Sequence, residues 1–209
     1  DVDHFIALKE EVNDIKILDQ SYRIPGGPIH ELSQSIINKV QNRFDKEYKP
    51  RDEIGILKRY SDITQVDMSK GNWLVLSSAN YFLDDAKDLC EIQGWYYQFK
   101  GMNSVSLKLL LALNNWEQWR KGELLNHLEI KNIYEYLGSS VVPGFQKGKT
   151  LHSDTKYKIE ECQKDHGLTT SAVWFDAFEG LDPITETYIR NMRANGEQIN
   201  KNPRIKMST

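Results

Sequence analysis

The sequence has few cysteines, no long apolar segment and no excess of basic charge. Its 209 residues include two cysteines, Cys90 and Cys162, which lie far apart and lack the spacing of a metal-binding or redox motif. No secretory leader is recognisable, so we expect reduced thiols and a cytoplasmic protein. No stretch approaches the roughly 18 apolar residues of a membrane span, so no membrane partner is expected.

The charge balance excludes one broad class of nucleic-acid binder. There are 27 Lys and Arg against 30 Asp and Glu, a formal net charge of -3. Tight non-specific binding to nucleic acid depends on many Lys and Arg contacts to phosphate, which this composition does not supply overall. A local cluster of basic residues is still compatible with this composition. The five histidines lack metal-ligand spacing, so no metal site is predicted.

A complete phosphate-binding loop is also missing. The segment from Gly144 to Thr150 is one residue too short between its glycines for that motif, and it lies in a region of helical pattern. A plain connector is the favoured interpretation. The alternative is a solvated basic loop whose Lys147 and Lys149 contact a DNA backbone.

The first hundred residues alternate between strand and helix patterns. Short strands are predicted at 15–18, 54–57, 63–66, 73–76 and 95–99, and the strand at 73–76 is expected to be buried on both faces. Helices are predicted at 3–11, from Pro28 to Val40 and from Leu83 to Ile92, while 42–53 is expected to be a loop. This alternation predicts an α/β layer with a mainly parallel sheet.

From Ser104 to Glu197 the pattern becomes almost entirely helical. Apolar residues at three- and four-residue steps predict helices near 105–119, 124–137, 157–166, 171–178 and 183–192. Trp116 and Trp119 lie among leucines at helical spacing, which favours a core position over a base-stacking surface. Pro203 then leads into a last strand. A helical block therefore interrupts the α/β domain, and both chain ends suggest a piece of a longer protein.

The segment Leu18-Asp-Gln20-Ser-Tyr22-Arg23, followed by Ile24-Pro-Gly-Gly-Pro28 and an amphipathic helix, resembles motif IV of superfamily 1 helicases of the UvrD/Rep/PcrA type. The similarity continues through Asn72-Trp-Leu-Val-Leu-Ser-Ser78 and the Tyr-bearing strand that ends in Gly101. The ending Pro203-Arg-Ile-Lys-Met-Ser-Thr209 is similar to the start of motif V.

The resemblance implies a partial RecA-like parallel sheet, interrupted by a mainly α-helical inserted subdomain. Residues 1–101 and 203–209 would form an incomplete second motor domain, and 102–202 the insertion. The parent protein would be an ATP-dependent DNA helicase moving 3′ to 5′. Its missing first motor domain would hold most of ATP and Mg²⁺, so this chain alone is expected to be inactive and to bind no cofactor.

The resemblance also assigns residue roles. Tyr22 would stack on adenine, Arg23 would reach the γ-phosphate as the catalytic cation, and Gln20 would belong to the same cofactor site. Thr209 matches a residue that contacts single-stranded DNA. Ser77, Ser78 and Asn80 occupy a DNA-contacting run whose arginine this chain lacks. The alternative is a non-catalytic α/β adaptor, or a degenerate helicase-like module, that binds a protein partner or DNA.

Overall fold

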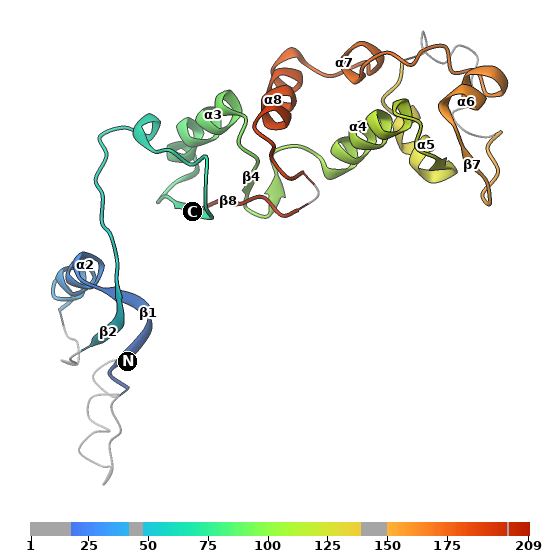
Figure 1. The fold of residues 1–209 in the computed structure, drawn as a ribbon. Helices are drawn as coiled ribbons and strands as arrows, with labels where there is room; N and C mark the ends of the chain where they lie inside the picture. The colour runs from blue at the N-terminus through green and yellow to red at the C-terminus, as the bar shows by residue number, and fades with distance from the viewer. Residues whose placement is uncertain (1–17, 42–47, 139–149, 200) are drawn as a thin grey trace. The chain divides into compact units, whose positions relative to one another are not determined.

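A computed structural model describes residues 18–41, 48–138, 150–199 and 201–209. The chain forms two compact units, Asp1–Ser61 and Asp62–Thr209, and each is described by itself. Together they are a mixed α/β structure with seven α-helices among the described residues and several small, partly parallel sheets (Figure 1). No helix in these ranges is long and apolar enough to cross a membrane. The expected division at 101/102 and 202/203 stays a prediction.

The first unit is built on two parallel strands and one helix. Strand β1 (Gln20–Gly26) pairs with β2 (Lys49–Ile54), and its register is interrupted between Gln20 and Pro25. Helix α2 (Pro28–Ile37) follows at once, because Gly27 adopts a positive φ of 70° and Pro28 suits the first helical turn. Its apolar residues are not buried within the described part of the chain.

Several predictions for the first unit are wrong. The motif itself forms strand β1, where we expected a loop after a strand at 15–18, and Leu18 is exposed. The expected loop at 42–53 contains most of β2, whereas the expected strand at 54–57 shares only Ile54 with it. Parallel pairing with β1 decides these limits, and local composition does not reveal it. The predicted helix 3–11 and residues 15–17 lie outside the described residues.

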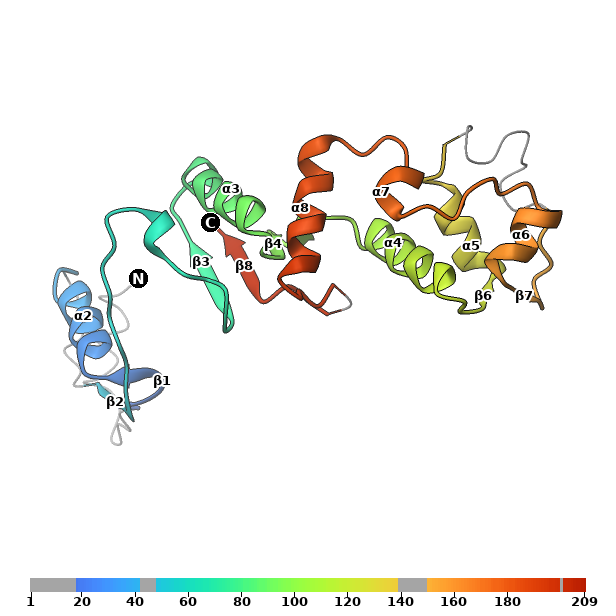
Figure 2. The same ribbon diagram turned by 45° about the horizontal axis from the view of Figure 1, so that its top comes forward.

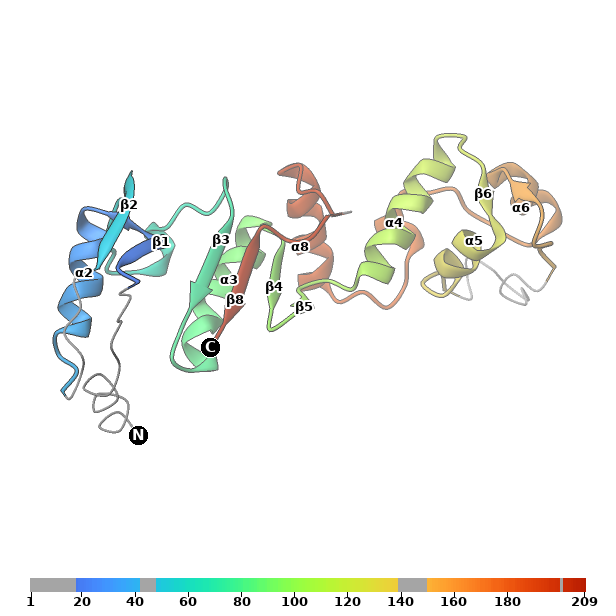
Figure 3. The same ribbon diagram turned by 90° about the horizontal axis from the view of Figure 1, so that it is seen from below.

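The second unit contains a four-stranded sheet in the order β3-β8-β4-β5. Strands β3 (Trp73–Leu76) and β4 (Tyr97–Phe99) both run parallel to β8 (Ile205–Ser208), which lies between them (Figure 3). Strand β5 (Met102–Asn103) pairs antiparallel with β4. The chain thus leaves the sheet after β5 and returns about a hundred residues later to fill its centre, and the described residues in between are mainly helical.

One face of this sheet is covered and the other is open. Helix α3 (Asp84–Gln93) follows β3 through a short 3-10 turn, η2 (Asn80–Leu83), and contributes Leu89 and Cys90 to the core with Ile205 and Met207. On the opposite face Leu74 and Leu76 of β3 are 63% and 67% exposed. The expectation that β3 is buried on both faces is therefore wrong, because the described residues of this unit place a helix on one side only.

The remaining helices of this unit have clear local start signals. Helix α5 (His127–Tyr134) begins with a capping box between Asn126 and Glu129, and α8 (Pro183–Ala194) begins with Asp182 accepting from Ile184 and Thr185. Helices α4 (Leu107–Arg120), α6 (Ile159–Asp165) and α7 (Trp174–Ala177) complete the block (Figure 2). The helical predictions are confirmed here, although 171–178 contains only one short helix.

The tryptophans hold this helical block together. Trp116 and Trp119 are fully buried, with ring centroids 6.1 Å apart in an edge-to-face arrangement. Their indole N–H groups donate to the carbonyls of Ala172, at 3.0 Å, and Tyr157, at 2.9 Å. The predicted core role is confirmed, and a base-stacking role for these two rings is excluded by their burial.

Two local predictions for this unit fail. Residues 63–66 form a 3-10 turn, η1 (Ile63–Gln65), because Asp62 accepts from the backbone N–H of Thr64 and so favours a turn over a strand. The helical block also contains an antiparallel pair, β6 (Leu125–Asn126) with β7 (Lys156–Tyr157). Two-residue strands carry too little pattern to be predicted.

Helix α8 returns the chain to the sheet by packing on α3. Gly94 ends α3 with a positive φ of 67°, and a Cβ there would lie 2.4 Å from the backbone of Asn191. The Tyr188 hydroxyl donates to the carbonyl of Trp95 at 2.9 Å, and Asn191 donates to that of Ile92 at 3.1 Å. These bonds fix where the chain re-enters the sheet as β8, and hence where Thr209 lies.

Candidate functional site

The predicted nucleotide residues lie on an irregular, exposed part of β1. Between Gln20 and Pro25 the strand has no regular partner in β2. The buried hydroxyl of Ser21 accepts the backbone N–H of Arg23 at 3.3 Å and that of Ile24 at 3.0 Å. This local bonding curls the backbone so that the side chains of Tyr22 and Arg23 both lie at the surface.

Tyr22 and Arg23 are available for a ligand. Tyr22 is 81% exposed, and among the described residues no side chain forms an ion pair or hydrogen bond with the Arg23 guanidinium. A shallow depression of about 480 Å³ adjoins them. Its lining residues are Gln20, Ser21, Tyr22, Arg23, Ile24, Ser33, Gln34, Ile37 and Tyr48. An exposed aromatic face beside a free guanidinium suits a planar ring and a phosphate.

Gln20 has a structural task in addition to its predicted one. Its side-chain amide donates to the carbonyl of Pro50 at 3.0 Å and to that of Ser21 at 3.1 Å. It thereby ties the start of β1 to β2. Gln20 is one of the residues that line the depression, and a direct ligand contact by its side chain stays a prediction.

The predicted nucleic-acid residues of the second unit meet at one edge of its sheet. Ser77, Ser78 and Asn80 follow β3, and Thr209 follows the neighbouring parallel strand β8. The Ser77 N–H donates to the backbone carbonyl of Ser208 at 3.2 Å, and the Thr209 hydroxyl donates to the side-chain amide oxygen Oδ1 of Asn80 at 3.4 Å. Ligands of parallel α/β sheets bind at this carboxyl edge.

Sequence reasoning missed one charged residue at the same edge. Lys100 follows β4, the third of the parallel strands, and its side chain is exposed. The signal in the sequence was a Lys-Gly pair between two residues of strand type, which is the composition of a tight turn. Lys147 and Lys149 lie outside the described residues.

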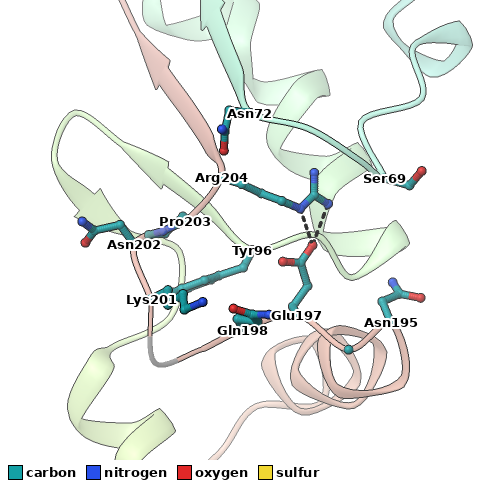
Figure 4. Close-up of a pocket in the computed structure, with 11 residues that line it drawn as sticks. Ser69, Asn72, Tyr96, Asn195, Glu197, Gln198, Lys201, Asn202, Pro203 and Arg204 are labelled. Atoms are coloured by element: carbon teal, nitrogen blue, oxygen red, sulfur yellow. Dashed lines mark hydrogen bonds and ion pairs between the residues drawn. The ribbon is translucent and has the colours of Figure 1, made fainter.

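A second hollow lies at the opposite, amino edge of the sheet (Figure 4). It has a volume of about 360 Å³, and it contains none of the predicted site residues. Arg204 donates to Glu197 through Nε at 3.2 Å and Nη2 at 2.7 Å, and also to the carbonyls of Met68 and Gly71. Because these groups are already paired with one another, their arrangement indicates a structural tie.

Neither of the two cysteines is placed to act as a nucleophile. Cys90 and Cys162 are buried free thiols, and burial raises the pKa of Cys90 to about 12 and that of Cys162 to about 11. Such thiols stay protonated at neutral pH. No group of three or more His, Cys, Asp or Glu side chains in the described ranges is placed to hold a metal ion.

Comparison with known proteins adds no relative: no family model, no curated protein and no solved structure matches this chain.

Proposed function

We propose that this chain belongs to the second, RecA-like motor domain of an ATP-dependent DNA helicase of the UvrD/Rep/PcrA type. The observation that carries the proposal is the pair Tyr22 and Arg23, adjacent on β1 and both presented to solvent by a buried serine. The parallel strands β3, β8 and β4, separated in sequence by a helical block, fit the same assignment.

In the proposed role the two side chains act on ATP and Mg²⁺ that another domain largely holds. Tyr22 stacks on the adenine ring and fixes its orientation. Arg23 donates to the γ-phosphate, where negative charge accumulates as the phosphoryl group transfers. An arginine supplied to that position from a second domain is worth roughly 10³–10⁵ in rate. It also makes nucleotide binding draw two domains together, which couples hydrolysis to movement along DNA.

In the proposed role, the carboxyl edge of the sheet is the surface that contacts DNA. Thr209 and the run Ser77, Ser78 and Asn80 present hydroxyl and amide groups together on neighbouring strand ends. Such neutral donors position a phosphodiester backbone without reading its sequence. This matches a motor that moves along strands of any sequence.

The test of the nucleotide role is Arg23→Ala in the protein that carries both motor domains. We expect DNA-stimulated ATP turnover to fall by roughly 10³-fold, because the transition-state charge loses its partner, while ATP binding changes little. Tyr22→Ala is expected to raise the KM for ATP, and Tyr22→Phe to restore it.

The matched control is Arg59→Ala, which removes an exposed arginine from the same compact unit. Its turnover should equal that of the unaltered protein. Near-normal turnover of the Arg23 variant would refute the assignment. So would a coding sequence in which no phosphate-binding loop accompanies this segment, and that result would favour a non-catalytic adaptor.

A further inference from the structure

The carboxyl edge of the sheet carries a lysine in an unfavourable backbone conformation. Lys100 has a φ of 48°, and it is the one non-glycine residue in the described ranges with a positive φ. Side chains with a Cβ disfavour this left-handed region. A lysine in this conformation despite its energetic cost suggests that the lysine side chain has a role of its own.

The cost arises because Lys100 and Gly101 form a two-residue hairpin turn. Phe99 of β4 pairs with Met102 of β5, and both intervening residues have positive φ, 48° and 83°. Turns of this kind favour Asn-Gly, Asp-Gly or Gly-Gly. The Lys100 N–H donates to the carbonyl of Met207 at 3.0 Å, which attaches the turn to β8. Asn at position 100 would therefore suit the backbone better than Lys does.

The position of Lys100 completes a row across three strand ends. Ser77 follows β3, Thr209 follows β8 and Lys100 follows β4, and these strands are parallel neighbours with Val75 and Phe99 both in register with Met207 (Figure 3). At about 4.8 Å between strands, the row spans about 10 Å. That is the rise of about three stacked nucleotides.

The charges of α3 near this edge are already paired or balanced, and Lys206 lies within β8 rather than beyond its end. Lys87 of α3 pairs with Asp84 at 2.8 Å, and its Nζ lies 4.1 Å from the centre of the Phe99 ring. Asp84 and Asp85 occupy the first turn of α3 and already balance the partial positive charge of that helix end. Lys100 is exposed, and its Nζ lies 5.6 Å from the same ring, a weaker contact that keeps the side chain at the edge.

We propose that Lys100 is a phosphate-binding residue for single-stranded DNA, which crosses the row formed by Ser77, Thr209 and Lys100. This inference rests on the DNA-contacting part of the proposed function and adds the charged contact that the neutral row lacks. An ammonium is a point charge that tolerates many phosphate positions, as a strand in motion requires.

The experiment measures binding of this chain to a fluorescent oligothymidylate of about 20 nucleotides, by anisotropy over a range of salt concentrations. Lys100→Asn is expected to weaken binding about three- to tenfold at low salt and to lower the slope of log K against log salt by about 0.7, the value for one phosphate contact. Lys100→Arg is expected to retain both the affinity and the salt slope of the unaltered chain. The thermal midpoint of Lys100→Asn should be unchanged or higher, because Asn fits the turn.

The matched control is Lys70→Asn, which removes the same charge from the exposed loop before β3, at the amino edge of the sheet. It should leave affinity and salt slope unchanged. An equal loss in the Lys70 variant, or no loss in the Lys100 variant, overturns the role of Lys100. If Asn80→Ala still weakens binding while Lys100→Asn does not, the DNA edge survives and only the lysine assignment fails. If the unaltered chain does not bind at low salt, both fail.

Discussion

A single buried hydroxyl shapes the segment that presents Tyr22 and Arg23. The Ser21 oxygen accepts two successive backbone N–H groups where β1 has no regular ladder partner. Those two amides would otherwise depend on water, so the serine substitutes for a missing strand. The nucleotide role proposed above thus depends on a serine whose hydroxyl is engaged by the backbone of the same segment.

Ser21→Ala tests this local control. We expect amide hydrogen exchange at Arg23 and Ile24 to become roughly tenfold faster, because each amide loses a bond worth about 0.5–1.5 kcal/mol. Site-resolved exchange by NMR measures it. Ser35→Ala is the control, since the Ser35 hydroxyl donates to the carbonyl of Leu32 within α2. Unchanged exchange at the two amides in Ser21→Ala would contradict this account of the loop.

The position of a single residue could be predicted from the sequence where residue type and spacing are sufficient to indicate it. Trp116 and Trp119 were placed in the core by their spacing, and their burial confirms it. Lys100 was missed, because the positive φ of a turn follows from how β4 and β5 pair, and a Lys-Gly pair signals it only weakly. Ser21 was missed because its role needs the irregular register between β1 and β2.

Among the elements, helices were easier to predict than strands. Helices α3, α4 and α8 carry apolar residues at helical spacing, and Asp182-Pro183 marks a start that needs no distant partner. Strand β2 is Lys49–Ile54, a charged segment with a proline, and only its parallel pairing with β1 makes it a strand. The short antiparallel pair β6 and β7 depends in the same way on residues that are 30 and 32 positions apart in the sequence.

Arg204, which lies just before β8, links the end of α8 to the sheet through an ion pair and hydrogen bonds. It joins Glu197, which follows α8, to the carbonyls of Met68 and Gly71, which precede β3. The Glu197 side chain is 9% exposed, so truncating the arginine leaves a carboxylate with little access to water. This ion pair is therefore placed to stabilise the way the helical block returns to the sheet.

Arg204→Ala is expected to lower the unfolding free energy of the second unit by about 2–3 kcal/mol, because it strands a largely buried carboxylate. Urea denaturation followed by tryptophan fluorescence measures it, and Glu197→Gln should cost less because an amide needs no counter-charge. Lys108→Ala is the control, since its partner Glu135 and Lys108 itself are both more than half exposed. Equal midpoints for the Arg204 and Lys108 variants would contradict the structural role.

For the molecule as a whole, the fold class was predictable and the extent of burial was not. The alternation of patterns in the first hundred residues predicted an α/β layer with a mainly parallel sheet, and a mixed α/β structure with several small, partly parallel sheets is found. The open face of β3, with Leu74 and Leu76 exposed, was not expected. A continuous apolar run indicates only that a strand can be covered on both sides, and the cover depends on other elements.

The large core of the second unit makes the stability of that unit, which holds most of the chain, sensitive to alkaline pH. Burial raises the pKa of Cys90 to about 12 and that of Cys162 to about 11, and it raises the pKa values of Tyr97, Tyr134 and Tyr188 above their usual range. In the unfolded chain thiols ionise near pH 9 and phenols near pH 10. The folded state therefore binds more protons than the unfolded state at alkaline pH.

Stabilisation from these groups is complete below about pH 8.5 and is lost as the pH rises toward the folded-state values. Above about pH 9 for the two thiols, and above about pH 10 for the three phenols, each group that ionises only on unfolding lowers the unfolding free energy by about 1.4 kcal/mol per pH unit. Urea denaturation between pH 7.5 and about 10.5 should show a flat region followed by a steep fall. Cys90→Ala should be less stable at pH 7.5 because of the cavity it leaves, but its stability should fall less steeply between about pH 9 and 10. A slope equal to that of the unaltered chain would show that Cys90 ionises equally in both states.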